Sequence, residues 1–153
     1  MAPLESVTNY RYRKHYHANF KGVDRFYIPF LQPHSFSLTN RDWKEIDVNN
    51  NSSLPDVVPQ IISNDVEETL WLINILKEYG YKEVNLNFGC PSGTVVSKGR
   101  GAGILKDLAK MRAYLSEIFA KSPLPISIKT RIGYEKEEEF WPILDIYNGF
   151  PIK

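Results

Sequence analysis

Short apolar segments alternate with amphipathic helical patterns along almost the whole sequence, and this alternation constrains the fold more than any other feature. The apolar segments are bounded by Gly, Pro and polar residues, which is typical of strands. Strands that alternate with helices through short connections indicate parallel βα units. The sequence predicts five strands, at residues 2–4, 26–30, 57–62, 84–88 and 126–130.

The intervening segments carry helix start and stop signals. Thr8 is a suitable N-cap for a first helix, and Gly22 lies just beyond its expected end. Asn64 or Asp65 can begin another helix, with a glutamate three residues on as a capping box, and Gly80 closes it. The expected helices cover residues 8–20, about 65–79, 103–121 and 137–147, the last with Pro142 near its start, and a short helix at 40–45 in a polar loop.

Two α/β folds are compatible with this alternation. An open doubly wound sheet of five strands would be complete in 153 residues. A (β/α)8 barrel of the TIM type needs about 250 residues. Length alone therefore favours the open sheet, whereas the motifs described below favour the barrel.

The composition is that of an ordinary globular protein, with 42% hydrophobic and 24% charged residues. No apolar run approaches the roughly 20 residues of a membrane span, and the N-terminus lacks the basic and apolar regions of a signal peptide. We therefore expect a cytoplasmic protein. The single cysteine allows neither an intramolecular disulfide nor a cysteine-based metal site, and we expect no metal.

The net charge of +1 neither favours nor excludes RNA as a partner. Positive charge is nevertheless unevenly distributed, and a cluster of this kind usually forms a solvated face. Lys98 with Arg100, and Lys129 with Arg131, form two smaller basic points. The main cluster comprises Arg11, Arg13, Lys14, His15, His17, Lys21 and Arg25.

Polar residues interrupt three of the predicted strands near their carboxyl ends. Gln60, Asn87 and Lys129 occupy these positions. A buried polar group without a partner costs about 1–3 kcal/mol, so each must be capped by loop backbone or bind a ligand. Three such residues at one rim favour a shared ligand. Amides and a lysine suit a planar heterocycle with carbonyl and imide edges, such as a flavin, whose reduced ring a lysine would stabilise.

Cys90 follows the fourth predicted strand, between Gly89 and Pro91. A free cysteine is often a small buried hydrophobic residue, but a loop position makes that role less typical. A nucleophilic cysteine needs a nearby base, and none of the three histidines follows the fourth or fifth predicted strand. A thiol is mostly protonated at neutral pH, so we interpret Cys90 as a proton donor.

The segment 99–103, Gly-Arg-Gly-Ala-Gly, opens the next predicted helix. Its backbone N–H groups could bind an anion, although the glycine spacing is not that of a dinucleotide site. A flexible loop leading into a helix is the simpler interpretation.

Together, these motifs resemble those of the tRNA-dihydrouridine synthases. Residues 2–8 are similar to the family's Ala-Pro-Met-x-Gly-Val-Thr, with Leu4 and Ser6 as departures. Gln60 matches the glutamine of the third strand. The resemblance extends over almost the whole chain in the same order. The remaining matches are residues 87–91 (Asn-Phe-Gly-Cys-Pro) followed by Val95 and residues 101–103, and residues 129–133, which resemble Lys-x-Arg-x-Gly.

The resemblance implies a (β/α)8 barrel that binds FMN, takes electrons from NADPH, and reduces uridine in tRNA to 5,6-dihydrouridine. Cys90 would protonate C5 of the uracil while the flavin delivers hydride to C6. The target base must leave its stack to reach the flavin. The residues implied for FMN are Pro3, Leu4, Glu5, Gln60 and Lys129, and those for the substrate are Asn87, Arg131, Lys98 and Arg100.

Family members continue through three more strands and a C-terminal helical domain. We therefore expect residues 1–153 to be the first five βα units of the FMN-binding barrel, without the helical tRNA-binding domain. Such a chain would be weakly active alone, and its open barrel edges would favour self-association.

Two other functions are compatible with the same motifs. Dihydroorotate dehydrogenases also use FMN on a barrel, with an Asn-rich loop and a proton-transferring Cys or Ser. A catalytically inactive fragment could instead serve as an RNA-binding or assembly module.

Overall fold

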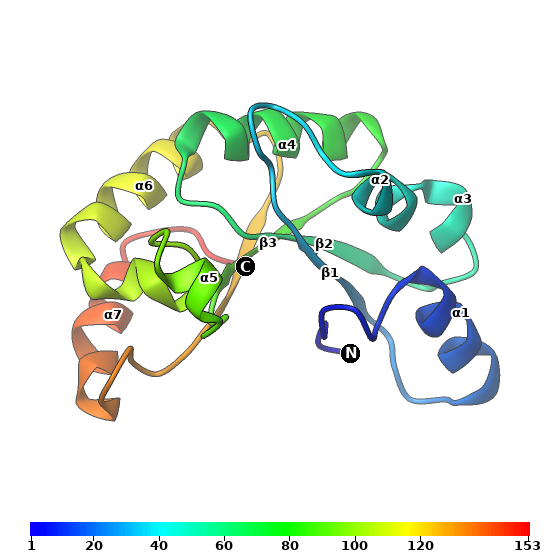
Figure 1. Ribbon diagram of the computed structural model, residues 1–153, viewed down its shortest axis with the longest axis horizontal. Helices are drawn as coiled ribbons and strands as arrows, with labels where there is room; N and C mark the ends of the chain where they lie inside the picture. The colour runs from blue at the N-terminus through cyan, green and yellow to red at the C-terminus, as the bar shows by residue number, and fades with distance from the viewer.

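The computed structural model describes residues 1–153, and its centre is a sheet of four parallel strands (Figure 1). The strands follow one another in the order β1-β2-β3-β4. A doubly wound sheet reverses its strand order at a switch point, whereas a barrel adds each strand beside the previous one. The sequential order therefore favours a barrel segment. The strands are β1 (Phe26–Leu31), β2 (Val57–Ile61), β3 (Val84–Phe88) and β4 (Ile126–Thr130).

The strand expected at residues 2–4 is wrong, so the sheet has four strands and not five. The N-terminal segment lies beside β1 but makes only the beginning of a ladder. The amide of Tyr27 donates to the carbonyl of Met1 at 3.2 Å, and the N-terminal amine donates to the carbonyl of Arg25. Pro3 has no N–H, so the ladder cannot continue through it.

The helices form an arc over one side of the sheet, with α2, α4 and α6 clearly visible in Figure 1. α4 and α6 contact one another, and α6 also contacts α7. The helices are α1 (Tyr10–Asn19), α2 (Asn40–Ile46), α3 (Val48–Asn51), α4 (Val66–Glu78), α5 (Gly93–Val96), α6 (Leu108–Lys121) and α7 (Phe140–Tyr147), with 3-10 helices at Gly101–Lys106 and Glu137–Glu139.

Helix boundaries differ from the expected ones where a different residue forms the cap. The N-cap of α1 is Asn9, whose side chain accepts from the amide of Tyr12, and not Thr8. The helix expected at 103–121 begins as a 3-10 helix and restarts as α6, because Asp107 caps a new first turn.

The start of α4 lacks the reciprocal half of the expected capping box. Asp65 caps α4 by accepting from the amide of Glu68 at 2.8 Å. The carboxylate of Glu68 instead accepts from the amide of Ser35 at 2.6 Å. Pro142 is tolerated in α7 because it lies in the first turn, where its missing N–H is not needed.

The hydrophobic core lies between the sheet and helices α4 and α6. Successive side chains of β3 point to opposite faces, so alternate residues enter this core. Val84, Leu86 and Phe88 are almost completely buried there, and each contributes about 1.5–3 kcal/mol of hydrophobic stabilisation. The other face of β2, β3 and β4 is therefore the inner face of the barrel segment. The helix residues in the same core cluster include Leu72, Ile73, Leu76, Met111, Leu115 and Ile118.

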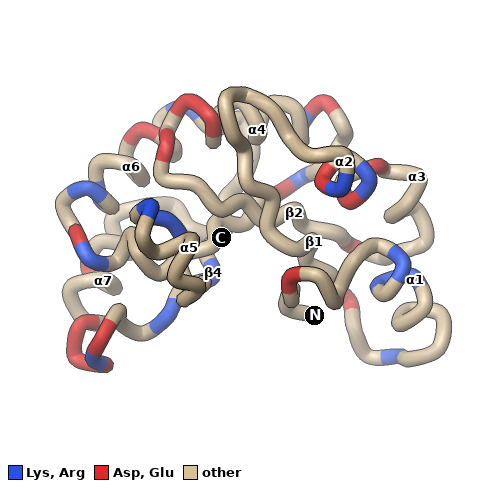
Figure 2. Tube along the Cα trace, in the orientation of Figure 1, with Lys and Arg blue, Asp and Glu red and all other residues tan.

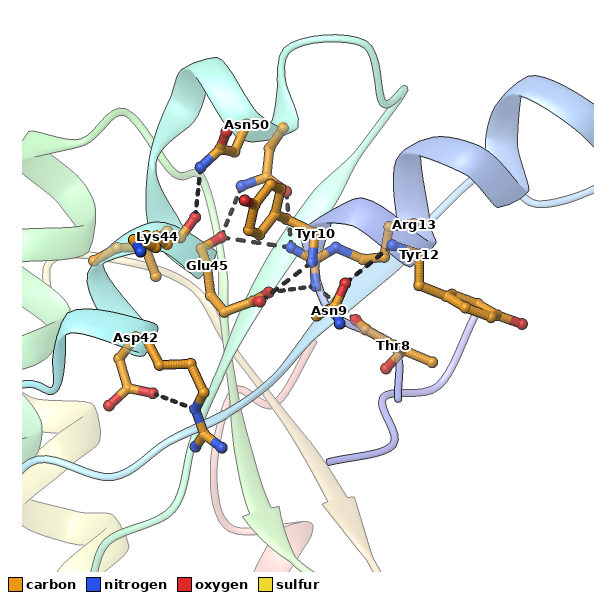
Figure 3. A network of polar contacts seen from close by, with 12 residues as sticks. Thr8, Asn9, Tyr10, Tyr12, Arg13, Asp42, Lys44, Glu45 and Asn50 are labelled. Atoms are coloured by element: carbon orange, nitrogen blue, oxygen red, sulfur yellow. Dashed lines mark hydrogen bonds and ion pairs between the residues drawn. The ribbon is translucent and has the colours of Figure 1, made fainter. Parts of the chain in front are cut away.

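A buried arginine joins α1, α2 and α3 (Figure 3). The side chain of Arg13 is fully buried and donates to the carbonyl of Thr8 at 2.8 Å. It also donates to a carboxylate oxygen of Glu45 at 2.9 Å and to Oδ1 of Asn51 at 2.9 Å. Burial lowers the pKa of the Arg13 guanidinium, and Glu45 opposes that shift.

The solvated-face interpretation of the N-terminal basic cluster is thus wrong for Arg13. Arg25 is partly exposed, and it forms ion pairs with Asp56 at 2.6 Å and Glu83 at 3.0 Å. These pairs join the starts of β1, β2 and β3. The cluster members exposed as expected are Arg11, Lys14, His15 and Lys21, and His17 is half-buried.

No helix combines the length and apolar character that crossing a membrane requires. The side chains also form no group of three or more His, Cys, Asp or Glu that could hold a metal ion.

Candidate active site

The loop that carries Cys90 is held by a side chain of the strand that precedes it. Oδ1 of Asn87 accepts from the backbone amide of Gly89 at 3.0 Å and from that of Cys90 at 2.9 Å. This is an Asx-type turn, in which a side-chain oxygen organises the following backbone. Asn87 is buried, so the loop is tied directly to the end of β3.

The glycine-rich segment packs behind the Cys90 loop. The amide of Ala102 donates to the carbonyl of Cys90 at 2.9 Å, and that of Gly103 to the carbonyl of Arg100 at 2.9 Å. Gly101 has a φ of +55°, and a Cβ there would lie 2.8 Å from the carbonyl oxygen of Cys90. These amides are bonded within the protein, so the anion-binding interpretation is not supported and the segment serves close packing.

The thiol of Cys90 is half-buried and free. No hydrogen bond joins it to a histidine: His15 and His17 lie on α1, and His34 contacts Ser35. A nucleophilic role would need such a base. The geometry is compatible with a thiol that donates a proton.

A cavity of about 320 Å³ opens on the inner face of the sheet. It brings together Pro3 and Lys129, two of the residues expected to contact FMN. Its volume lies at the lower end of the range for small-molecule sites. The lining residues are Ala2, Pro3, Tyr27, Asn85, Ser127, Ile128, Lys129 and Lys153.

The other residues expected to contact FMN lie outside this cavity. Leu4 and Glu5 are exposed, and Glu5 lies 3.9 Å from Arg41. Gln60 is fully buried among the side chains of the inner face. Its Nε2 donates to Oδ1 of Asn85 at 2.7 Å, and its Oε1 accepts from Nδ2 of Asn87 at 2.8 Å.

Basic residues surround the Cys90 loop, and Figure 2 shows them after α5 and between β4 and α7. Lys129 pairs in register with Asn87 across the two strands. A Cβ on Gly89 would lie 3.6 Å from the side chain of Arg131. Lys98, Lys129 and Arg131 are exposed, and the ion pairs of the structure include none of them.

Arg100 differs from these three cations because it is tied to the start of α4. Its Nε donates to Oδ1 of Asn64 at 3.3 Å, and its Nη2 lies 3.7 Å from the Glu68 carboxylate. Arg100 therefore helps to anchor the loop after α5, whereas Lys98 is free to meet a ligand.

Three further polar residues of the inner face have no counterpart among the expected site residues. Asn85, Ser127 and Glu83 are buried and hydrogen-bonded to one another through Ser127. The sequence signal that could have identified them is the period-two spacing of polar residues along β3 and β4, because alternate residues of a strand lie on one face of a sheet.

Comparison with known proteins identifies the family. The sequence model described as dihydrouridine synthase (Dus) matches residues 1–146. The probable tRNA-dihydrouridine synthase 2 of Bacillus subtilis is 29% identical over 143 residues, which are 92% of this chain and 43% of the relative. The probable tRNA-dihydrouridine synthase of Staphylococcus epidermidis is 27% identical over 151 residues, again 92% of this chain and 43% of the relative.

A shorter match links the chain to a tRNA-dihydrouridine(20/20a) synthase of Xanthomonas axonopodis pv. citri, which is 33% identical over 66 residues, 43% of this chain and 20% of the relative. The chain spans less than half the length of these relatives. The matches confirm the resemblance found in the motifs and, with the sequential parallel strands, a (β/α)8-type barrel segment. The chain therefore belongs to the dihydrouridine synthase family.

Proposed function

We propose that this chain forms the first part of the active site of an enzyme that reduces uridine in tRNA to 5,6-dihydrouridine, with FMN as cofactor and NADPH as reductant. One observation carries the proposal. The Cys90 loop is held by Asn87 at the end of β3, and Lys129, which pairs in register with Asn87, lines an inner-face cavity together with Pro3. Family membership supports the same reaction.

The residues around the cavity fit a flavin ring in their chemistry. Lys129 is a cation without a carboxylate partner, on a wall of the cavity, and can stabilise negative charge on the pyrimidine part of a reduced flavin. Pro3 contributes an apolar surface on the same cavity. Reduced FMN, when bound, supplies the hydride that adds to C6 of the uracil.

Cys90 serves as the proton donor for C5 of the uracil. Hydride addition at C6 leaves an enolate, and a proton from the Cys90 sulfur completes the reduced C5–C6 bond. The thiol is half-buried, and no basic side chain is hydrogen-bonded to it that would deprotonate it. Asn87 contributes by holding the backbone of Cys90 in place.

The tRNA partner would meet the exposed cations next to this loop. Lys98 and Arg131 have no carboxylate partners and can neutralise phosphates of the substrate. The uracil must leave its stack to reach the inner face, and phosphate contacts on either side would hold the strand while it does so.

The direct test uses the chain with FMN, NADPH and unmodified tRNA. Mass spectrometry of the digested tRNA should detect dihydrouridine at a low level, and Cys90→Ala should abolish it while leaving tRNA affinity nearly unchanged. Lys129→Met should weaken FMN binding, measured by quenching of flavin fluorescence. A Lys110→Met variant, on the exposed side of α6, is the control.

Two results would contradict the proposal. One is a chain that neither binds FMN nor modifies tRNA when supplied with both. The other is oxidation of dihydroorotate without any reduction of tRNA.

A further inference from the structure

A chain of hydrogen bonds crosses the inner face of the sheet from the Cys90 loop to Glu83, near the opposite ends of the strands. It runs through side chains of three strands that lie far apart in the sequence. Its bonds are Cys90 N to Asn87 Oδ1 (2.9 Å), Asn87 Nδ2 to Gln60 Oε1 (2.8 Å), Gln60 Nε2 to Asn85 Oδ1 (2.7 Å), Asn85 Nδ2 to Ser127 Oγ (2.9 Å) and Ser127 Oγ to Glu83 Oε1 (2.7 Å).

Every bond in this chain has the same direction, with each donor pointing toward Glu83. Turning over the amide of Asn85, Gln60 or Asn87 would bring two donors or two acceptors face to face. The two ends independently require the same direction, because a backbone N–H can only donate and an ionised carboxylate can only accept. The orientation of all three amides is therefore determined by the network.

Burial makes this orientation costly to change. Gln60 has no exposed surface, and Glu83, Asn85, Asn87 and Ser127 are each at most 8% exposed. A polar group left without a partner there loses its hydrogen bond and gains no water in exchange. In a low-dielectric interior, successive bonds also polarise and strengthen one another.

Glu83 is anchored as a carboxylate by two cations. Lys153 Nζ lies 2.6 Å from its Oε2, and Arg25 Nη1 lies 3.0 Å from the same oxygen. Burial alone would raise the pKa of Glu83, but the bonds from Lys153 and Ser127 and the charge of Arg25 outweigh burial and lower it. The accepting end of the chain is thus maintained at neutral pH.

We propose that Glu83, Ser127 and Asn85 are positioning residues that act through Gln60 to orient Asn87, and thereby hold the Cys90 loop. The role in catalysis rests on the proposed function, whereas the positioning concerns this chain alone. Gln60 is then a link in the chain of hydrogen bonds.

The fixed orientation has a consequence for ligand binding. Oδ1 of Asn87 already accepts two backbone bonds, and Nδ2 already donates to Gln60. The capacity that remains on the Asn87 side chain is one N–H of Nδ2. Asn87 therefore offers a donor, and its ligand must present an acceptor atom there.

Amide hydrogen exchange followed by NMR tests the positioning without any enzymatic activity. Ser127→Ala cuts the chain and leaves the ion pairs of Glu83 intact. It should speed exchange of the Gly89 and Cys90 amides by about tenfold or more, the factor expected for losing a buried hydrogen bond. Ser127→Thr, which keeps the hydroxyl, should restore slow exchange.

Thr69→Val is the matched control, because it removes a buried hydroxyl that bonds to Tyr114 on the helical side of the sheet. Thr69→Val should not speed exchange of the Gly89 and Cys90 amides more than it speeds exchange of the other amides of the protein. Equal effects of Ser127→Ala and Thr69→Val on these amides would overturn the proposal.

The unmodified protein provides a second measurement in case Ser127→Ala does not fold. The side-chain amide protons of Gln60, Asn85 and Asn87 should exchange far more slowly than those of the exposed Asn40 and Asn148. Equally rapid exchange in both groups would also overturn the proposal.

Titration with FMN and then with uridine monophosphate examines the donor assignment of Asn87. A shift of the free Nδ2 proton on binding of either ligand supports it, and saturation with both without a shift contradicts it. A chain that shows the exchange pattern but neither binds FMN nor modifies tRNA would contradict the proposed function and leave the positioning intact.

Discussion

Lys153 Nζ lies 2.6 Å from Glu83 Oε2, and the backbone amide of Lys153 donates to the carbonyl of Ile126 at 2.9 Å. Lys153 thus lies beside the outer edge of β4, and its side chain lines the cavity on the inner face of the sheet. With Arg25 and Asp56, this pair forms an ionic cluster at the amino ends of the strands, where barrels concentrate stabilising contacts.

The lowered pKa of Glu83 predicts a loss of stability in acid. A carboxylate whose folded-state pKa is depressed stabilises the fold above its unfolded pKa, and that contribution disappears as pH falls through the folded value. Urea unfolding should therefore show stability falling as the pH drops below the ordinary glutamate value of 4.5. Glu83→Gln should cost about 1.5–3 kcal/mol at neutral pH and flatten this acid limb. The exposed Glu78→Gln should leave the limb unchanged.

The buried pair of Arg13 and Glu45 should be intolerant of losing one partner. Glu45→Ala leaves a fully buried guanidinium without its counter-ion, which costs about 3–5 kcal/mol. Urea denaturation followed by circular dichroism measures this loss. Arg11→Met, at an exposed position of the same helix, should change stability by less than about 0.5 kcal/mol. Comparable losses for both variants would contradict the assigned role of Arg13.

Close packing behind the Cys90 loop makes Gly101 a sensitive position. An alanine there meets the carbonyl oxygen of Cys90 at 2.8 Å and must adopt a φ of +55°. Gly101→Ala should cost about 1–3 kcal/mol and alter the alkylation rate of Cys90. Gly93→Ala is the control, since nothing lies within 4 Å of its added methyl. Equal stability and alkylation rates for the two variants would refute the packing argument.

The free cations next to the Cys90 loop predict a salt-dependent interaction with tRNA. Lys98→Ala and Arg131→Ala should each weaken binding and reduce the slope of log affinity against log salt by about one. Filter binding at several salt concentrations measures both quantities. Arg100→Ala should weaken tRNA binding mainly by destabilising the loop after α5, because Arg100 is bonded to Asn64. Unchanged slopes for Lys98→Ala and Arg131→Ala would place the RNA elsewhere.

The edges of the four-stranded sheet predict concentration-dependent self-association. On the outer edge of β4, the amide of Lys153 donates to the carbonyl of Ile126. Ile132 and Trp141, which follow β4 in the sequence, are exposed apolar residues. Unpaired strand edges and exposed apolar residues favour pairing with a second copy. Sedimentation velocity should show a mass that rises with concentration, and Ile132→Lys should reduce it. A monomer at all concentrations would contradict this prediction.

The sequence by itself determined the elements whose signals are local. The bounds of β3 and β4 were correct, and Asp65 was one of the two residues expected to begin α4, because apolar runs, caps and glycines act over a few residues. The motif around Cys90 was sufficient to suggest the family, since its residues are contiguous in the chain.

Only the tertiary structure decided which polar residues are buried and what they bond. In the sequence, Arg13 is one of a run of cations that were expected to be solvated. In the structure it is buried and bonds to Glu45 of α2. The amide of Gln60 bonds to Asn85 and Asn87, which follow it by 25 and 27 positions. Such contacts depend on strand register and helix packing, and no local pattern encodes the partner of a buried hydrogen-bonding group.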